Sequence, residues 1–353
     1  MLNKTLTVIF GAGASHDCIV KHNRKPLPTK NFVAKLPLTD DLFDIEGYQP
    51  ILSAYRGAEA VGHIYKRNRS VNKKETLEEY LKTLFKNSPD KNLHMNIRQV
   101  SFYLRNVIGN ICTDVREQFG QTAYMDVVDY MASSDYSKIV LITLNWDLLL
   151  DWALYDRAGF RYKSLDSYVN HDDRWHYIKL HGSVNWIKRV RMGDLSGKKT
   201  DEPLDLITSV DPNGPIVKGA EFQFDNNFHY SDGAYFRYPI MMLPHAEEKK
   251  HICPPNHLEA ILSILEECEE FWVIGNSMKD VDITSLLKGV CKKASRIKIV
   301  DAPISPNEKN AHKYRIQQCF LKADFQRQYI SFKQFAEKID VNAPFEPTSP
   351  FDE

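Results

Sequence analysis

The sequence lacks an excess of charge of either sign. Lys and Arg number 46 and Asp and Glu also number 46, so the formal net charge of the 353 residues is zero. Because a protein that holds a nucleic-acid backbone needs a basic surface, this balance argues against direct nucleic-acid binding. Hydrophobic residues make up 43% and charged residues 26%, which excludes a disordered or fibrous chain. The length allows two or three domains, or one large domain with insertions.

The sequence also lacks a long uncharged apolar run. Its most apolar stretch, 139–154, is interrupted by Asn145, Asp147 and Asp151, so no span of about 20 residues is suited to crossing a membrane. The apolar run at 6–10 is shorter than the ~7–15 residues of a secretory signal, and polar residues follow it. We therefore expect a cytoplasmic protein without a membrane anchor.

Paired cysteines are missing as well. The six cysteines are spread over the whole chain without C-x-x-C spacing, which predicts reduced thiols and excludes a zinc ribbon. His251, Cys253 and His257 are close in sequence, but two prolines separate them and a fourth ligand is absent. We predict an ordinary loop there and no metal site.

Short apolar and β-branched runs predict strands, and several are apolar throughout, as in parallel sheets buried on both faces. A helical stripe that includes Leu258 and Leu265 precedes one of these runs. Strands alternating with helices predict an α/β fold with a doubly wound, Rossmann-like parallel sheet. The predicted strands are 5–10, 139–143, 177–180, 240–243, 271–274 and 297–300.

More than a hundred residues with helical patterns separate the first two strands. Thr76 and Glu79 form a capping-box pattern at one helix, and the stripe from Val100 to Val115 predicts another of about five turns. We expect a catalytic domain of residues 1–35 and 137–335, an inserted helical subdomain of residues 36–136, and a proline-containing tail of residues 336–353. Residues 190–237, rich in Gly, Pro, Asp and Lys, predict a long irregular segment.

Polar residues follow the ends of the predicted strands, where ligands bind in open α/β sheets. Taken singly, each is as well explained by a turn or a helix cap. Five such sites in one chain favour a shared ligand site. They are Gly11-Ala12-Gly13-Ala14-Ser15, Asn145 with Asp147, His181-Gly182-Ser183, Gly275-Asn276-Ser277, and Asp301.

In this order the motifs resemble the signature motifs of the sirtuin superfamily, and in detail the bacterial sirtuin-like NAD hydrolases of anti-phage defence systems. The resemblance covers residues 6–17, 137–187 and 238–301, about a third of the chain. The resembling motifs are Gly11-Ala12-Gly13-Ala14-Ser15, Pro37-Leu38-Thr39-Asp40-Asp41-Leu42, Thr143-Leu144-Asn145-Trp146-Asp147, Leu180-His181-Gly182-Ser183 and Ile274-Gly275-Asn276-Ser277-Met278-Lys279-Asp280-Val281-Asp282.

The resemblance implies NAD as substrate and gives each residue an expected role. Asn145 and His181 take the two catalytic positions, and Asp147 supports the pocket for the nicotinamide ribose. The pyrophosphate group would be held by Gly11, Ala12, Gly13 and Ser15, and the adenosine half by Gly275, Ser277 and Asp301. Sirtuin deacylases carry a four-cysteine zinc module that this sequence lacks, so the resemblance implies cleavage of NAD to nicotinamide and ADP-ribose rather than deacylation.

Other functions stay open at the level of sequence. They are NAD-dependent deacylation, ADP-ribosyl transfer to a protein, and a non-catalytic sensor of NAD or ADP-ribose. A metal nuclease is disfavoured, because Glu221-Phe222-Gln223 has glutamine where a nuclease motif has lysine. Within the resembled group, proteins form homo-oligomers or act with a partner such as a HerA-type ATPase or a short Argonaute, and we expect one of these arrangements here.

Overall fold

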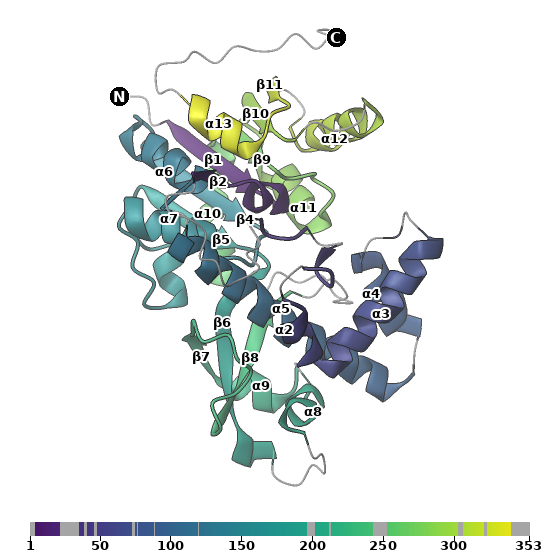
Figure 1. Cartoon of the computed structure of the whole chain (residues 1–353). Coiled ribbons are helices and arrows are strands. Elements are labelled where there is room, and N and C mark those ends of the chain that lie inside the picture. Colours follow the sequence, from purple (N-terminus) through teal and green to yellow (C-terminus); the bar gives the residue numbers. More distant parts are fainter. Residues whose placement is uncertain are drawn as a thin grey trace.

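A six-stranded parallel sheet is the centre of the fold. The computed structural model describes residues 4–21, 35–38, 41–45, 48–72, 75, 77–87, 89–118, 120–195, 202–211, 213–242, 253–302, 306–320 and 323–339. The strands lie in the order β11-β10-β9-β1-β4-β5, so the chain builds outward from β1 on one side and then returns to its other side (Figure 1). This is the doubly wound order, and it confirms the predicted fold class. The strands are β1 (Thr5–Phe10), β4 (Lys138–Thr143), β5 (Trp175–Lys179), β9 (Glu270–Ile274), β10 (Arg296–Val300) and β11 (Asp324–Gln328).

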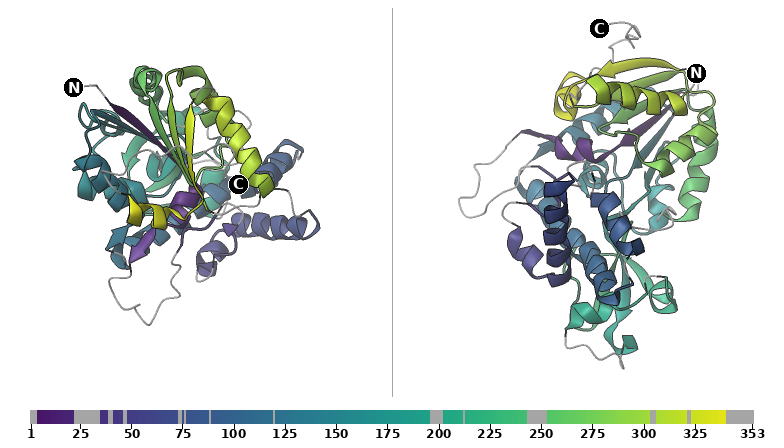
Figure 2. Two further views of the ribbon diagram at one scale, coloured as in Figure 1. Left: turned by 90° about the horizontal axis from the view of Figure 1, so that it is seen from above. Right: turned by 90° about the vertical axis from the view of Figure 1, so that its right-hand side faces the viewer.

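Both faces of this sheet are buried. Within β1, Leu6, Val8 and Phe10 belong to one apolar cluster and Ile9 to the other, as the alternation of side chains along a strand requires. Helices therefore cover the sheet on both sides (Figure 2). The first cluster includes residues of α6 (Ala123–Ser133), α7 (Leu149–Arg157) and α13 (Phe332–Lys338), and the second includes residues of α10 (Pro255–Glu267), α11 (Val281–Val290) and α12 (Pro306–Cys319).

The long connection from β1 to β4 is mainly helical, as predicted. Its longest helix, α5, has 28 residues, which corresponds to about eight turns rather than the predicted five. Buried residues of α5 belong to the same apolar cluster as one face of the sheet. Thr76 lies outside the described residues, but α4 begins directly after it. The elements that precede α6 in this connection are α1 (Ala12–His16), β2 (Ile19–Lys21), α2 (Gln49–Ser53), α3 (Arg56–Val71), α4 (Leu77–Asn87), α5 (Lys91–Gln118) and β3 (Gln121–Thr122).

A second, antiparallel sheet corrects two predictions. The run at 240–243 is expected among the parallel strands, but Ile240 and Met241 lie at the end of β8, which pairs antiparallel with β6 in the order β7-β6-β8, and residue 243 lies outside the described residues. Residues 190–237 are not one irregular segment, because the described part contains short helices and strands whose few residues show too little periodicity to be recognised. These elements are β6 (Gly182–Arg191), η3 (Met192–Leu195), α8 (Pro203–Thr208), α9 (Pro215–Gly219), β7 (Glu221–Phe224) and β8 (Tyr235–Met241).

All six cysteines are free and buried. Among the residues described, no helix has both the length and the apolar character needed to cross a membrane.

Glycines let the turn after β1 approach the turn after β9. The amide of Gly11 donates to the carbonyl of Ile274 at 3.0 Å, and the amide of Gly13 donates to that of Gly275 at 3.0 Å. Gly275 has φ of +58°, and a Cβ there would lie 2.1 Å from the backbone nitrogen of Ala14. Only glycine fits both the left-handed backbone and this contact.

We expect Gly275→Ala to lower the free energy of unfolding by at least ~2 kcal/mol, because the new methyl group collides with backbone that cannot move alone. Gly289→Ala in α11 is the matched control: no atom lies within 4 Å of its Cβ position, so the change should be neutral or stabilise by up to about 1 kcal/mol. Urea denaturation measures both. Equal stability of the two variants would contradict the proposed close approach.

Candidate functional site

The register of the parallel strands brings the predicted site residues to one edge of the sheet. Phe10 pairs with Thr143 on one side and with Ile274 on the other. Thr143 then pairs with Lys179, and Ile274 with Val300. The residues one or two positions beyond these pairs therefore form a row across five adjacent strands: Gly11, Asn145, His181, Gly275 and Asp301.

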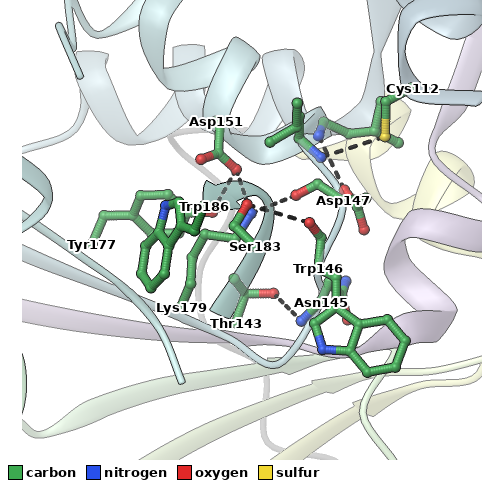
Figure 3. A network of polar contacts seen from close by, with 12 residues as sticks. Cys112, Thr143, Asn145, Trp146, Asp147, Asp151, Tyr177, Lys179, Ser183 and Trp186 are labelled. Atoms are coloured by element: carbon green, nitrogen blue, oxygen red, sulfur yellow. Dashed lines mark hydrogen bonds and ion pairs between the residues drawn. The ribbon is translucent and has the colours of Figure 1, made fainter. Parts of the chain in front are cut away.

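The loops that carry the two predicted catalytic residues are hydrogen-bonded to each other. The carbonyl oxygen of Trp146, next to Asn145, accepts from the amide of Val184 at 2.9 Å. It also accepts from the Ser183 hydroxyl at 3.3 Å, two residues after His181 (Figure 3). The loop after β4 and the start of β6 are thus held side by side.

Asn145 is anchored through its side-chain nitrogen. Nδ2 donates to the carbonyl oxygen of Gly11 at 2.9 Å and to Ser15 Oγ at 2.8 Å. The backbone amide of Asn145 donates to Thr143 Oγ1 at 3.0 Å. The side chain is partly exposed, and no described residue donates a hydrogen bond to its Oδ1. The amide oxygen is therefore the polar atom that Asn145 offers to a ligand.

Ser15 connects Asn145 to a buried carboxylate and a buried phenol. Its hydroxyl lies 2.6 Å from Asp147 Oδ2 and 2.8 Å from the hydroxyl of Tyr124 on α6. Burial raises the pKa of both Asp147 and Tyr124, while the Lys179 charge and the Ser15 hydrogen bond favour the carboxylate form of Asp147. The Ser15 hydroxyl is thus directed into the protein, and the role predicted for Ser15 in pyrophosphate binding stays a prediction.

A buried ion pair lies beneath the loop after β4. Lys179 Nζ is 2.8 Å from Asp151 Oδ2 and also donates to the backbone oxygen of Asp147 (Figure 3). Asp151 further accepts from the hydroxyls of Tyr168 at 2.7 Å and Tyr177 at 3.0 Å. Both charged side chains are at most 3% exposed. The pair therefore fixes the loop that carries Asn145 from the interior of the protein, through the backbone of Asp147.

Lys179 is a member of the site that lies in none of the predicted site motifs. The available signal was a lysine within a predicted strand that is otherwise apolar. A charge at such a position requires a buried partner, because an isolated ammonium group cannot leave water without a large cost in free energy. The partner, Asp151, lies 28 residues earlier, at the start of α7.

We predict that Lys179→Met lowers the free energy of unfolding by roughly 3–5 kcal/mol, because it leaves the Asp151 carboxylate buried without its cation. The double variant Lys179→Met/Asp151→Asn should lose clearly less than the sum of the two single variants. Urea denaturation of the four proteins gives the coupling. Additive losses, or a Lys179→Met variant as stable as wild type, would show that the pair does not hold this loop.

His181 faces a carboxylate from the other half of the sheet. Its Nε2 lies 3.5 Å from Asp280 Oδ2, and the two side chains are 12% and 15% exposed. Asp280 precedes α11, where its Oδ1 accepts from the amide of Ile283 at 3.3 Å. The carbonyl of His181 accepts from the amide of Met242 at 2.9 Å. An imidazole held in this way can take up a proton, since the carboxylate stabilises the imidazolium ion.

The Gly275-Asn276-Ser277 segment forms a tight turn. The amide of Met278, a residue with φ of +53°, donates to Asn276 Oδ1 at 2.8 Å. Arg315 Nε donates to the carbonyl of Ser277 at 2.8 Å, and the Ser277 side chain is exposed. The Ser277 hydroxyl is therefore accessible to a ligand, and it lies at the same edge of the parallel sheet as Asn145.

Asp301 follows β10 next to a buried histidine. Burial raises the pKa of Asp301, and His312 Nδ1 lies 3.4 Å from its Oδ2. Burial, together with the charge of Arg315, lowers the pKa of His312 to about 4. His312 is therefore neutral at neutral pH, and its contact with Asp301 is a polar contact rather than an ion pair.

No cluster suited to a metal ion is found in the part of the chain that the structure describes. Of the three residues at 251–257 that could bind a metal, His251 lies outside the described residues. Cys253 and His257 are buried, and His257 lies in the first turn of α10 rather than in the predicted loop, with its Nε2 2.9 Å from the carbonyl oxygen of Leu165.

The lowered pKa of His312 predicts a pH dependence of stability. Its pKa is about 4 in the folded protein and about 6.5 in the unfolded chain, so the unfolded chain binds the proton first on acidification. Stability should fall between pH 6.5 and 4, by on the order of 2–3 kcal/mol from this group. Asp301 acts in the opposite sense, because its folded pKa is raised. In His312→Gln the loss, measured by urea denaturation across this range, should be smaller; equal losses would contradict the assignment.

No family model matches the sequence, and no curated protein matches it. Among solved structures, the chain is similar to a Sir2 homologue in complex with NAD, with 12% identity, a TM-score of 0.42 and coverage of 95% of this chain and 87% of the other. It is also similar to a mutant Sir2 homologue in complex with ADP-ribose, with 12% identity, a TM-score of 0.43 and coverage of 95% and 90%. A third is a Sir2 protein bound to a propionylated peptide, with 14% identity, a TM-score of 0.36 and coverage of 95% and 91%.

Proposed function

We propose that the protein cleaves the bond between nicotinamide and ribose in NAD and transfers the ADP-ribose to water. One observation carries the proposal: Asn145 and His181 follow adjacent parallel strands at equivalent positions, on loops that are hydrogen-bonded to each other. Cleavage of this bond builds positive charge on the ribose, as in glycoside hydrolysis. A site for it needs a group that orients water and a group that accepts a proton.

Asn145 is suited to the first task. Its Nδ2 is held by Gly11 and Ser15, and its Oδ1 remains as an acceptor. An acceptor fixed in this way can orient a water molecule or a ribose hydroxyl. Fixing the geometry before the reaction lowers the entropic part of the barrier.

His181 is suited to the second task. It accepts the proton released by the attacking water, directly or through a ribose hydroxyl. Asp280, 3.5 Å away, then stabilises the positive charge that forms on the imidazole. A positioned base of this kind contributes about 10²–10⁴ to the rate.

The remaining edge residues fit the rest of the dinucleotide. Gly11 and Gly13 pack against the turn after β9, and the pyrophosphate group would lie along the exposed side of this turn, at Ala12. The exposed Ser277 hydroxyl and the partly exposed Asp301 carboxylate are suited to ribose hydroxyls. Asp147 acts indirectly, because its carboxylate holds Ser15 and through it Asn145.

The ordered motifs support further proposals about the protein's place in the cell. We propose that the chain belongs to the sirtuin superfamily, in its bacterial anti-phage defence branch, and that it depletes NAD in the cytoplasm. Because an unrestrained NAD hydrolase would starve its own cell, we propose control through homo-oligomerisation or through a partner such as a HerA-type ATPase or a short Argonaute.

The test is to incubate the purified protein with NAD, alone and with candidate partners, and to follow nicotinamide and free ADP-ribose by chromatography. We expect Asn145→Ala and His181→Ala each to lower the rate by at least ~100-fold with the fold intact. Asn92→Ala and His63→Ala are matched controls, because both residues are exposed on helices of the β1–β4 connection, and they should act as wild type.

Three results would contradict this proposal. Wild-type turnover in His181→Ala would remove the assigned base. ADP-ribose found on a protein, or an acyl group removed from a peptide, would show the transfer or deacylation alternative. Binding of NAD without release of nicotinamide under any of these conditions would indicate a sensor.

A further inference from the structure

We infer that Tyr124 is a positioning residue: through Ser15, and through its own contact of 3.4 Å with Asn145 Nδ2, its hydroxyl fixes the side-chain amide of Asn145 so that the oxygen, and not the nitrogen, faces the ligand. The inference rests on the proposed function, in which Asn145 contacts the reacting atoms. Tyr124 comes from α6 and lies in none of the sequence motifs. It is 109 positions from Ser15, to which its hydroxyl is hydrogen-bonded.

The hydrogens around Ser15 can be assigned by counting donors and acceptors. A serine hydroxyl has one hydrogen and two lone pairs. The carboxylate of Asp147 can only accept, and at 2.6 Å it takes the hydrogen of Ser15. The contact at 2.8 Å must then be a donation from Tyr124 to Ser15. The contact with Asn145 at 2.8 Å must also be a donation, which identifies the Asn145 atom as the nitrogen.

The carbonyl of Gly11 requires the same orientation independently. It lies 2.9 Å from the same atom of Asn145 and can only accept a hydrogen bond. Both hydrogens of the Asn145 amide are therefore used within the protein. The group presented to the ligand is an acceptor, which selects a hydrogen-bond donor such as water or a ribose hydroxyl and disfavours a phosphate or carbonyl oxygen.

Tyr124 is itself held by packing that does not involve the ligand. Its ring contacts Phe10 edge-on at 5.2 Å between centroids and Phe332 at 5.1 Å, and the side chain is 1% exposed. Without its hydroxyl, one lone pair of Ser15 loses its donor in a buried place. Ser15 and the Asn145 amide then have fewer fixed partners and can rotate.

Tyr124→Phe tests this, because it removes one oxygen and keeps the ring packing. We expect kcat for NAD cleavage to fall roughly three- to tenfold, the worth of one buried hydrogen bond, with KM within about twofold of wild type. Ser15→Ala removes all three contacts and should lower kcat further. The matched control is Tyr103→Phe, which removes a buried hydroxyl on α5 that donates to the Leu42 carbonyl at 2.6 Å. It should lose similar stability without a change in kcat.

A second readout does not depend on activity. In protein labelled with ¹⁵N-asparagine, the Asn145 side-chain amide signal is identified by its absence from Asn145→Ala. We expect Tyr124→Phe to shift this signal and speed its hydrogen exchange, and Tyr103→Phe to leave it unchanged. If the wild-type protein cleaves no NAD, the proposed function is wrong, but the Asn145 amide signal still shows whether Tyr124 fixes this side chain. An Asn145 signal identical in Tyr124→Phe and wild type, or equal losses of kcat in both tyrosine variants, would overturn it.

Discussion

The buried pair of Lys179 and Asp151 is the interaction on which the arrangement of the site depends. Removing two charges from water costs free energy that their attraction alone often fails to offset. Here the hydroxyls of Tyr168 and Tyr177 also donate hydrogen bonds to the carboxylate. Lys179 uses a further hydrogen on the backbone of Asp147, so the pair joins β5, α7 and the loop after β4.

A second fixed point lies on the other side of that loop, where the turns after β1 and β9 meet through glycine. This is where the strand order reverses, the position at which doubly wound sheets bind their ligands. Asn145 lies between the two fixed points and is bonded to Gly11 and Ser15. Its amide is thus held by a backbone oxygen and a serine hydroxyl before any ligand binds, which is the preorganisation that the proposed catalytic role requires.

The sequence predicted those parts of the structure that depend on local pattern. The runs of β1, β4 and β9 are buried on both faces, and β5 and β10 are mostly buried, so their apolar residues alone predict these strands. β11, with the sequence DFQRQ, pairs only with β10 at the edge of the sheet. Its polar composition gives no strand pattern, so it was not predicted. The run at 240–243 is as apolar as a parallel strand, and only its pairing with β6 distinguishes it.

The same limit applies to the site. The row of polar residues could be predicted because strand ends lie at one edge of a parallel sheet whatever the details of packing. The contacts that orient those residues join positions far apart in sequence, such as Tyr124 with Ser15 and His181 with Asp280. They depend on how α6 and α11 pack on the sheet, which no local pattern of residues encodes.

The central claim is that one edge of the parallel sheet forms a single dinucleotide site. Hydrogen exchange of backbone amides, measured with and without NAD, tests it most directly. A dinucleotide site at this edge predicts slower exchange at the turns after β1, β4, β5, β9 and β10, and unchanged exchange in β6–β8 beyond the first residues of β6. Protection confined to the antiparallel sheet or to the amino ends of the parallel strands, or no protection at saturating NAD, would contradict it.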